Sequence, residues 1–193
     1  HLSEAFNPLH PFLFIIGGIK FETKLPLVRK FLDIADSVFV GGALANDIFK
    51  QRGLQIGKSI VSVEKIDLSG IAEHKKLLLP LDVRVKKVDS ETDGDSGAVV
   101  KKPSEVLADE KILDCGPATL AMLKEHANSA KMLVWNGPLG DYEDDFEEGT
   151  EALARIIAGG SARSIVGGGD TIAAIGKLKL EEHFAFVSTG GGA

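Results

Sequence analysis

The segment from Ser164 to Thr171, S-I-V-G-G-G-D-T, combines residue types that can hold a phosphate and a divalent cation. A short apolar run ends in three glycines, and Asp170 and Thr171 then open a predicted helix. Glycine lets the backbone turn sharply and approach a ligand closely, and the first N–H groups of a helix attract an anion. The carboxylate of Asp170 suits a divalent cation, but this segment by itself favours the role of an N-terminal cap of the helix. Both interpretations of Asp170 stay open on this segment alone.

Glycines also follow the other predicted strands. The glycines at strand ends are Gly17 and Gly18, Gly41 and Gly42, Gly137, Gly167 to Gly169, and Gly190 to Gly192. In an open parallel sheet, ligands bind beyond the carboxyl ends of the strands, which lie at one edge. Tight turns would explain one or two such pairs. The larger number favours close approach of the backbone to a flat or polyanionic ligand, such as a nucleotide.

Polar side chains beside these glycines fit the same interpretation. Lys20 and Lys24 follow the first pair and could meet phosphates as point charges, although surface lysines are common. Asn136 ends its strand, where its amide could bind a phosphate oxygen or close a turn. Glu143 could accept hydrogen bonds from ribose hydroxyls. Its acidic neighbours favour a solvated helix start near Asp144 as the alternative.

Several other kinds of site are disfavoured. The chain has no G-x-x-x-x-G-K-[ST] loop and no G-x-G-x-x-G after its first strand. The acidic run at 89–97 resembles the start of a calcium loop, but its twelfth position is Val100, so an exposed turn before a hairpin arm at 98–100 is expected. The histidines lack metal-ligand spacing. Cys115 and Trp135 are expected to be packing residues.

Predicted strands and helices alternate along the chain, and they must position the residues described above. Continuous apolar runs predict strands within 12–20, 37–43, 76–85 (interrupted at Pro80), 112–116, 131–140, from 164 and from 184. Helical spacing predicts helices from near Pro26 to Ile34, and at 44–52, from 117, at 150–158 and at 170–177. This order predicts an α/β fold with a doubly wound, mainly parallel six-stranded sheet, helices on both faces (Rossmann-like), and a small polar hairpin near 86–110. We expect residues 1–11 to be a linker or interdomain remnant and 12–193 to form one nucleotide-binding domain.

The totals exclude some classes of protein. A net charge of −6 over 193 residues argues against a nucleic-acid binder. No apolar run approaches the roughly 20 residues that span a bilayer, and a single cysteine is compatible with a reducing cytosol. We therefore expect a cytoplasmic protein without membrane or nucleic-acid partners. We also expect a monomer, although the totals themselves do not bear on the oligomeric state. The absence of an initial methionine and the final glycine-rich turn predict a fragment.

Taken in order, these motifs resemble the C-terminal nucleotide-binding half of the phosphoglycerate kinase family. The resemblance runs from about Pro11 to Ala193, and nine motifs in family order are far more specific than one glycine-rich loop. The motifs are G-G-I-K-F-E-T-K (17–24), G-G-A-L-A-N-D-I-F-K (41–50), G-L-Q-I-G-K-S (53–59), L-P-L-D-V (79–83), L-D-C-G-P-A-T (113–119), V-W-N-G-P-L-G-D-Y-E (134–143), F-E-E-G-T (146–150), G-G-G-D-T (167–171) and S-T-G-G-G-A (188–193).

The resemblance implies phosphoryl transfer between 1,3-bisphosphoglycerate and ADP, with magnesium. It implies that Gly190, Gly191 and Gly192 line the transferring group and that Asp170 holds the metal. The implied nucleotide contacts are Gly17, Gly18, Gly41 and Gly42 at adenine, Glu143 at ribose, Lys20, Lys24 and Asn136 at the phosphates, Gly168, Gly169 and Thr171 around the phosphate chain, and Pro138.

The chain also departs from the family pattern. Ile19 stands where the family usually has alanine, Ala43-Leu44 where a third glycine and a methionine-like residue are usual, and Asp141-Tyr142 where V-F is usual. The family's N-terminal half, whose arginines and histidine hold the triose acid, has no counterpart in this sequence. We therefore expect the chain to bind Mg-ADP or Mg-ATP without catalysing the kinase reaction by itself. The alternative is a non-catalytic nucleotide-binding module of the same fold.

Overall fold

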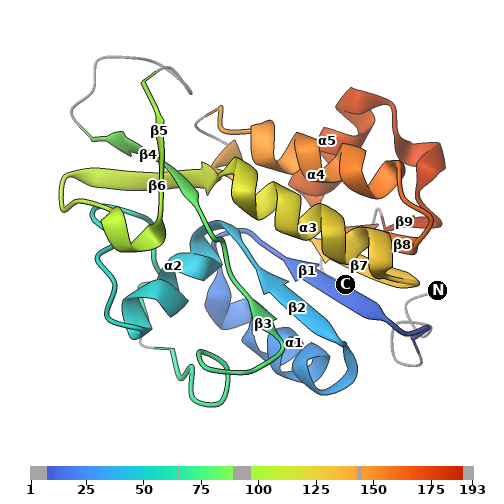
Figure 1. Ribbon diagram of the computed structural model, residues 1–193, viewed down its shortest axis with the longest axis horizontal. Coiled ribbons are helices and arrows are strands. Elements are labelled where there is room, and N and C mark those ends of the chain that lie inside the picture. Colours follow the sequence, from blue (N-terminus) through green and yellow to red (C-terminus); the bar gives the residue numbers. More distant parts are fainter. Residues whose placement is uncertain (1–7, 65, 89–96, 143–144, 189–193) are drawn as a thin grey trace.

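The computed structural model describes residues 8–64, 66–88, 97–142 and 145–188, and its main feature is a parallel sheet (Figure 1). Six strands lie in the order β3-β2-β1-β7-β8-β9, and each neighbouring pair is parallel. The predicted six-stranded parallel sheet is confirmed. The strands are β1 (Phe12–Ile16), β2 (Ser37–Val40), β3 (Leu77–Leu78), β7 (Met132–Asn136), β8 (Arg163–Gly167) and β9 (Phe186–Ser188).

Helices cover both faces of this sheet, as predicted. Figure 1 shows α1 (Phe21–Ile34) and α2 (Gly42–Gln51) on one side, with α3 (Pro117–Ser129), α4 (Glu148–Ala158) and α5 (Gly169–Leu178) on the other. Alternate residues of β1 enter separate cores: Phe14 packs with α1 and α2, whereas Ile15 packs with the other three helices. Successive side chains of a strand point to opposite faces, so a sheet covered on both sides needs continuous apolar strands.

A small antiparallel sheet lies beside α2. It has the order β5-β4-β6, formed by β4 (Val83–Lys87), β5 (Val99–Lys101) and β6 (Glu110–Cys115). The predicted hairpin arm at 98–100 is confirmed as β5. The acidic run at 89–96 lies outside the described residues.

Two expectations about strands were wrong in detail. The run at 76–85 is not one strand, because β3 ends before Pro80 and β4 begins after it in the other sheet. Proline cannot donate a ladder hydrogen bond, which explains the break. The strand expected at 112–116 is β6, which pairs with β4 in the small sheet rather than extending the alternating parallel series.

Two helix starts also differ from expectation. Helix α1 begins at Phe21, so Pro26 lies inside the helix rather than near its start. Helix α4 begins at Glu148, two residues before the predicted start at Thr150. The helix start expected near Asp144 falls outside the described residues. Short 3-10 helices of the described residues include η2 (Pro103–Glu105) and η4 (Glu181–His183).

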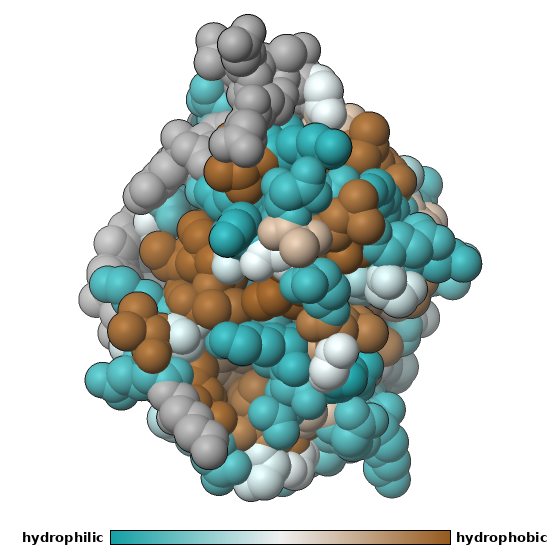
Figure 2. Space-filling model, turned by 90° about the vertical axis from the view of Figure 1, so that its left-hand side faces the viewer, coloured by the Kyte–Doolittle hydropathy of each residue, from teal (hydrophilic) through white to brown (hydrophobic). Residues whose placement is uncertain are grey.

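Apolar side chains are exposed on the surface as well as buried. The face in Figure 2 shows apolar groups lying between polar ones. Residues near the small sheet contribute to the exposed apolar surface of the molecule: Val88, Val99, Val100 and Leu107. Across the described ranges, no helix combines the length and apolar character that a membrane crossing requires.

Candidate functional site

A cleft of about 750 Å³ opens where β1, β7 and β8 end. Parallel strands place these ends at one edge of the sheet, which brings segments far apart in sequence together. The predicted site residues that line this cleft are Gly18, Lys20, Lys24, Asn136, Pro138, Gly168, Gly169 and Asp170. The cleft thus contains both predicted lysines, the predicted strand-end amide and the predicted metal ligand.

Lys24 and Asp170 supply opposite charges to this cleft from helices on opposite faces of the sheet. The Lys24 Nζ donates a hydrogen bond of 2.5 Å to the carbonyl oxygen of Gly17. Burial lowers the pKa of Lys24, and the Asp170 carboxylate acts in the opposite direction. A cation, a carboxylate and a helix N-terminus that line one cleft form an environment that suits a phosphate with its divalent cation.

Asp170 is not the cap of α5. The N-cap position is Gly168, which has no side chain, and Asp170 lies in the first turn of the helix. A carboxylate there still interacts favourably with the helix dipole. The observed position leaves the carboxylate at the cleft rather than bonded across the helix end.

Thr171 has a different environment from its neighbours. Its side chain is fully buried, and its hydroxyl oxygen accepts a hydrogen bond of 3.0 Å from the backbone N–H of Gly137. It does not line the cleft. In this structure Thr171 joins the loop after β7 to the start of α5, and thereby fixes the distance between two walls of the cleft.

The other glycines at this edge are required by the protein's own packing. A Cβ at Gly17 would lie 2.0 Å from the carbonyl oxygen of Pro138, and one at Gly137 would lie 2.4 Å from that of Gly17. A Cβ at Gly41 would lie 2.7 Å from the ring of Phe39, and Gly42 has a φ of 60°. Of these four, only Gly42 and Gly137 line a cavity. Close approach of strand ends therefore explains these glycines without a ligand.

Gly168 and Gly169 differ from that group. Gly168 has a φ of 98°, which only glycine adopts readily. A Cβ at Gly169 would meet no atom within 4 Å. The backbone at the start of α5 therefore faces open space in the cleft, where a ligand could approach it.

A narrow recess of about 30 Å³ extends from the cleft between α2 and β6. Gly18, Ile19, Ile60, Gly140 and Asp141 line both cavities. The lining of the recess alone includes Gly42, Asn46, Phe49, Asp114 and Cys115.

Asp114 is the most strongly perturbed carboxylate of the recess. Its side chain accepts hydrogen bonds from the backbone N–H groups of Gly149 and Cys115, each of 2.8 Å. Burial nevertheless raises the pKa of Asp114 to about 6, and the charge of Arg84 only partly offsets this. Burial also raises the pKa of the Cys115 thiol. Cys115 is a buried residue, as expected from the sequence.

Sequence reasoning missed several residues of the cleft. Thr23 and Lys30 follow Lys20 at helical spacing, so the same face of α1 could have identified them. Asp141 and Tyr142 were noted only as departures from the family. The Asp141 carboxylate accepts a hydrogen bond of 2.8 Å from Lys111 Nζ, and burial raises the pKa of Tyr142. Ile60 carried no signal, because it reaches the cleft from a loop.

Some predicted residues lie outside the described part of the chain. These are Glu143 and Gly190, Gly191 and Gly192. Their assignments stay predictions.

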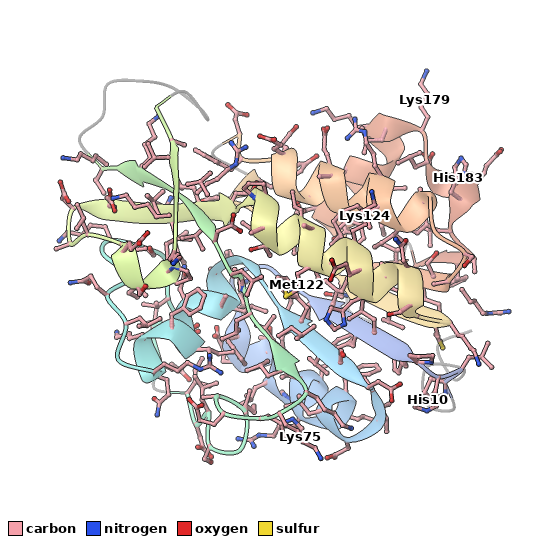
Figure 3. The ribbon with its side chains drawn as sticks, in the orientation of Figure 1. His10, Lys75, Met122, Lys124, Lys179 and His183 are labelled. Carbon is pink, nitrogen blue, oxygen red and sulfur yellow. The ribbon has the colours of Figure 1, made fainter. Side chains whose placement is uncertain are left out.

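The described residues contain no group of three or more histidine, cysteine or acidic side chains that could hold a metal. His10 and His183 lie well apart in Figure 3, and the His10 ring contacts the Asp36 carboxylate at 2.6 Å.

Known proteins provide an independent comparison. The family model "Phosphoglycerate kinase" matches residues 1–193. The chain is 42% identical to a phosphoglycerate kinase of Coxiella burnetii over all of its own length and 50% of that protein. It is 41% identical to one of Francisella tularensis subsp. tularensis over 97% of this chain and 49% of the relative.

Solved structures agree with this result. The structure of phosphoglycerate kinase from Coxiella burnetii aligns with a TM-score of 0.90 and 40% identity, covering 99% of this chain and 50% of that chain. Phosphoglycerate kinase from Pyrococcus horikoshii aligns with a TM-score of 0.79 and 28% identity, covering 99% and 49%. The chain spans about half the length of these relatives. Sequence and structure together show that this chain belongs to the phosphoglycerate kinase family.

Proposed function

We propose that this chain is the nucleotide-binding half of a phosphoglycerate kinase, which transfers a phosphoryl group between 1,3-bisphosphoglycerate and ADP. The observation that carries the proposal is the meeting of Lys24, Asp170 and the open N-terminus of α5 at one cleft. Lys24 comes from α1 on one face of the sheet, whereas Asp170 and the helix N-terminus belong to α5 on the other face. No single structural role of the fold explains why they meet. A nucleotide with a bound cation accounts for all three.

Each group has a distinct role in this proposal. Lys20 and Lys24 offset the negative charge of the phosphates, and the N–H groups at Gly169 and Asp170 bind phosphate oxygens. Magnesium fits the site because Asp170 offers a hard oxygen ligand, and this ion usually keeps several waters and phosphate oxygens around it. When bound, the ion neutralises charge on the phosphate chain. The protein's contribution is positioning and electrostatic stabilisation, which suffice for phosphoryl transfer.

We further propose that the chain does not turn over substrate by itself. Its relatives are about twice as long, and the resemblance assigns binding of 3-phosphoglycerate to their other half. Kinases exclude water by closing around both substrates. A chain that contains only the nucleotide cleft lacks the partner surface for this closure.

A non-catalytic nucleotide-binding module is the second candidate. It is favoured by Ile19, Asp141 and Tyr142, which line the cleft and depart from the usual family residues. This module would bind ADP but stay inactive when the other half of a related kinase is supplied. Restored turnover after mixing with that half would favour the first candidate.

Calorimetric titration with ADP, with and without magnesium, tests the proposal. We expect micromolar-to-millimolar binding that magnesium strengthens, and we expect Asp170→Ala to remove most of the magnesium effect. Asp33→Ala, an exposed acid on α1 away from the cleft, is the matched control. Absence of ADP binding, or an unchanged magnesium effect in Asp170→Ala, would contradict the assignment.

A further inference from the structure

One residue that lines the recess has a buried polar atom without a partner. Asn46 lies in α2 and is 2% exposed. Its side-chain Nδ2 donates a hydrogen bond of 2.9 Å to the carbonyl oxygen of Ile60. The opposite amide orientation would place two oxygen atoms against each other, so this bond fixes which way the amide faces.

The Oδ1 of Asn46 has no hydrogen-bond partner in the structure. Among the residues that the structure describes, it is the one buried side-chain polar atom without a hydrogen-bond partner. A buried carbonyl oxygen without a donor carries a desolvation cost, and native proteins rarely leave one unpaired. The oxygen is therefore set for a donor that enters from outside the chain.

The mostly apolar lining of the recess around Asn46 favours a neutral hydrogen-bond donor over a charged one. The other polar side chains that line the recess include the carboxylates of Asp114 and Asp141, and none of the lysines, arginines and histidines that the structure describes lines it. Asp114 already accepts two backbone hydrogen bonds, and Asp141 is paired with Lys111. Most of the remaining lining is apolar. The recess thus offers an acceptor in an apolar slot.

Its size and position indicate which part of a ligand enters. The recess opens into the cleft through shared lining residues, and about 30 Å³ holds a small group rather than a whole base. A base lying in the cleft beside Gly18 could insert only its edge. For adenine, that edge carries the 6-amino group, a hydrogen-bond donor.

We propose that Asn46 is a specificity-determining residue whose Oδ1 accepts a hydrogen bond from the 6-amino group of adenine. This inference rests on the proposed nucleotide function and names the base that the cleft selects. Guanine and hypoxanthine carry an oxygen at position 6, which would face the Asn46 oxygen. Two acceptors without a hydrogen between them disfavour binding, so amino purines bind and oxo purines are rejected.

The test compares ADP with inosine diphosphate and with purine riboside diphosphate, which has only hydrogen at position 6. Calorimetric titrations with magnesium use the unaltered chain, Asn46→Leu and Asp47→Ala. Asp47 is the matched control because it also ties α2 to the following loop, through the N–H of Ser62 at 3.1 Å, but lines neither cavity. Melting temperatures establish that each variant is folded.

We expect the unaltered chain to bind ADP roughly tenfold or more tightly than either analogue. In Asn46→Leu the ratio should fall to near one, whereas Asp47→Ala should keep it. If Asn46→Leu does not fold, the comparison of the three nucleotides on the unaltered chain still tests the proposal.

Two results would overturn the proposal, in different ways. If all three nucleotides bind the unaltered chain equally, the oxygen is satisfied by water and the inference about Asn46 is wrong, while the nucleotide function stands. An unchanged ratio in a folded Asn46→Leu has the same meaning. If no nucleotide binds, the proposed function and the inference fail together.

Discussion

Two sets of glycines lie at the same edge of the sheet and have different reasons to be glycine. The packed glycines, Gly17, Gly41 and Gly137, leave no room for a Cβ, because backbone atoms or an aromatic ring occupy the space. The open glycine, Gly169, meets no atom of the protein at that position. In sequence the two sets look alike, since each follows an apolar strand.

This difference shows that glycine clusters can have internal and external causes in one fold. The packed glycines let the ends of β1, β2 and β7 approach, with Gly17 N–H donating to Asn136 O at 2.9 Å and Gly18 N–H to Pro138 O at 3.0 Å. The open glycine leaves a helix N-terminus accessible. Substitutions should therefore separate stability from ligand binding.

The largest effect should come from Gly17→Ala. The new Cβ would lie 2.0 Å from the carbonyl oxygen of Pro138 and 3.1 Å from that of Gly137, so the strand ends must separate. We expect a loss of about 3 kcal/mol or more in the free energy of unfolding, measured by urea denaturation. Gly53→Ala is a control for glycine loss in an uncrowded place, although its φ of 79° adds its own strain. A change under about 1 kcal/mol in Gly17→Ala would remove the distinction between packed and open glycines.

A further glycine, Gly149, packs against a buried carboxylate, which is a third kind of environment beside the packed and open glycines. A Cβ at Gly149 would lie 2.2 Å from an Asp114 oxygen. The pKa of Asp114 rises from 3.8 to about 6 in the folded chain. The folded state therefore binds more protons than the unfolded state between these values, so Asp114 makes stability fall as pH rises from about 4 to 6.

Asp114→Asn should remove this pH dependence. From pH 4 to pH 7, we expect the stability of the variant to rise relative to the original chain by up to about 3 kcal/mol. Urea denaturation at both pH values measures the difference, and other carboxylates cancel because both chains contain them. A difference that does not change with pH would mean that Asp114 ionises normally.

The lysines of the cleft give an intermediate effect. Lys24 is partly buried, bonds Gly17 O and interacts with Asp170, whereas Lys20 is exposed at the start of α1. Under the proposed function, Lys24→Met should weaken ADP binding by about tenfold and Lys20→Met by less, since solvent screens an exposed charge. Calorimetric titration of both variants gives the ranking. A larger loss in Lys20→Met would reverse these roles.

Gly169→Ala should have the smallest effect on stability. Alanine fits the open position and the helical backbone, so the free energy of unfolding should change by less than about 1 kcal/mol. ADP affinity should nevertheless fall several-fold, because the methyl group occupies the space that a phosphate would approach. A large loss in the free energy of unfolding would contradict the inference that Gly169 faces open space. An unchanged affinity for ADP would mean that the phosphates bind elsewhere.

Much of the site could be predicted because it follows strand ends. Once the strands at 131–140 and from 164 are recognised, Asn136 and Asp170 must lie at one edge of a parallel sheet. Thr171 could not be placed, because only its contact with Gly137 shows that the hydroxyl faces inward. Asn46 carried no signal either, since its unpaired oxygen depends on the loop at Ile60.

Local patterns in the sequence determined the alternation of strands and helices and hence the doubly wound sheet. Continuous apolar runs require burial on both faces, and a parallel arrangement with helices on each side provides it. Tertiary structure alone decided the division of 76–85 between two sheets and the burial of Asp82, whose carboxylate accepts the backbone N–H groups of Ala118 and Thr119 at the start of α3. It also decided which glycines face protein and which face the cleft. These features depend on contacts between segments distant along the chain, whereas periodicity reports only the immediate neighbours of each residue.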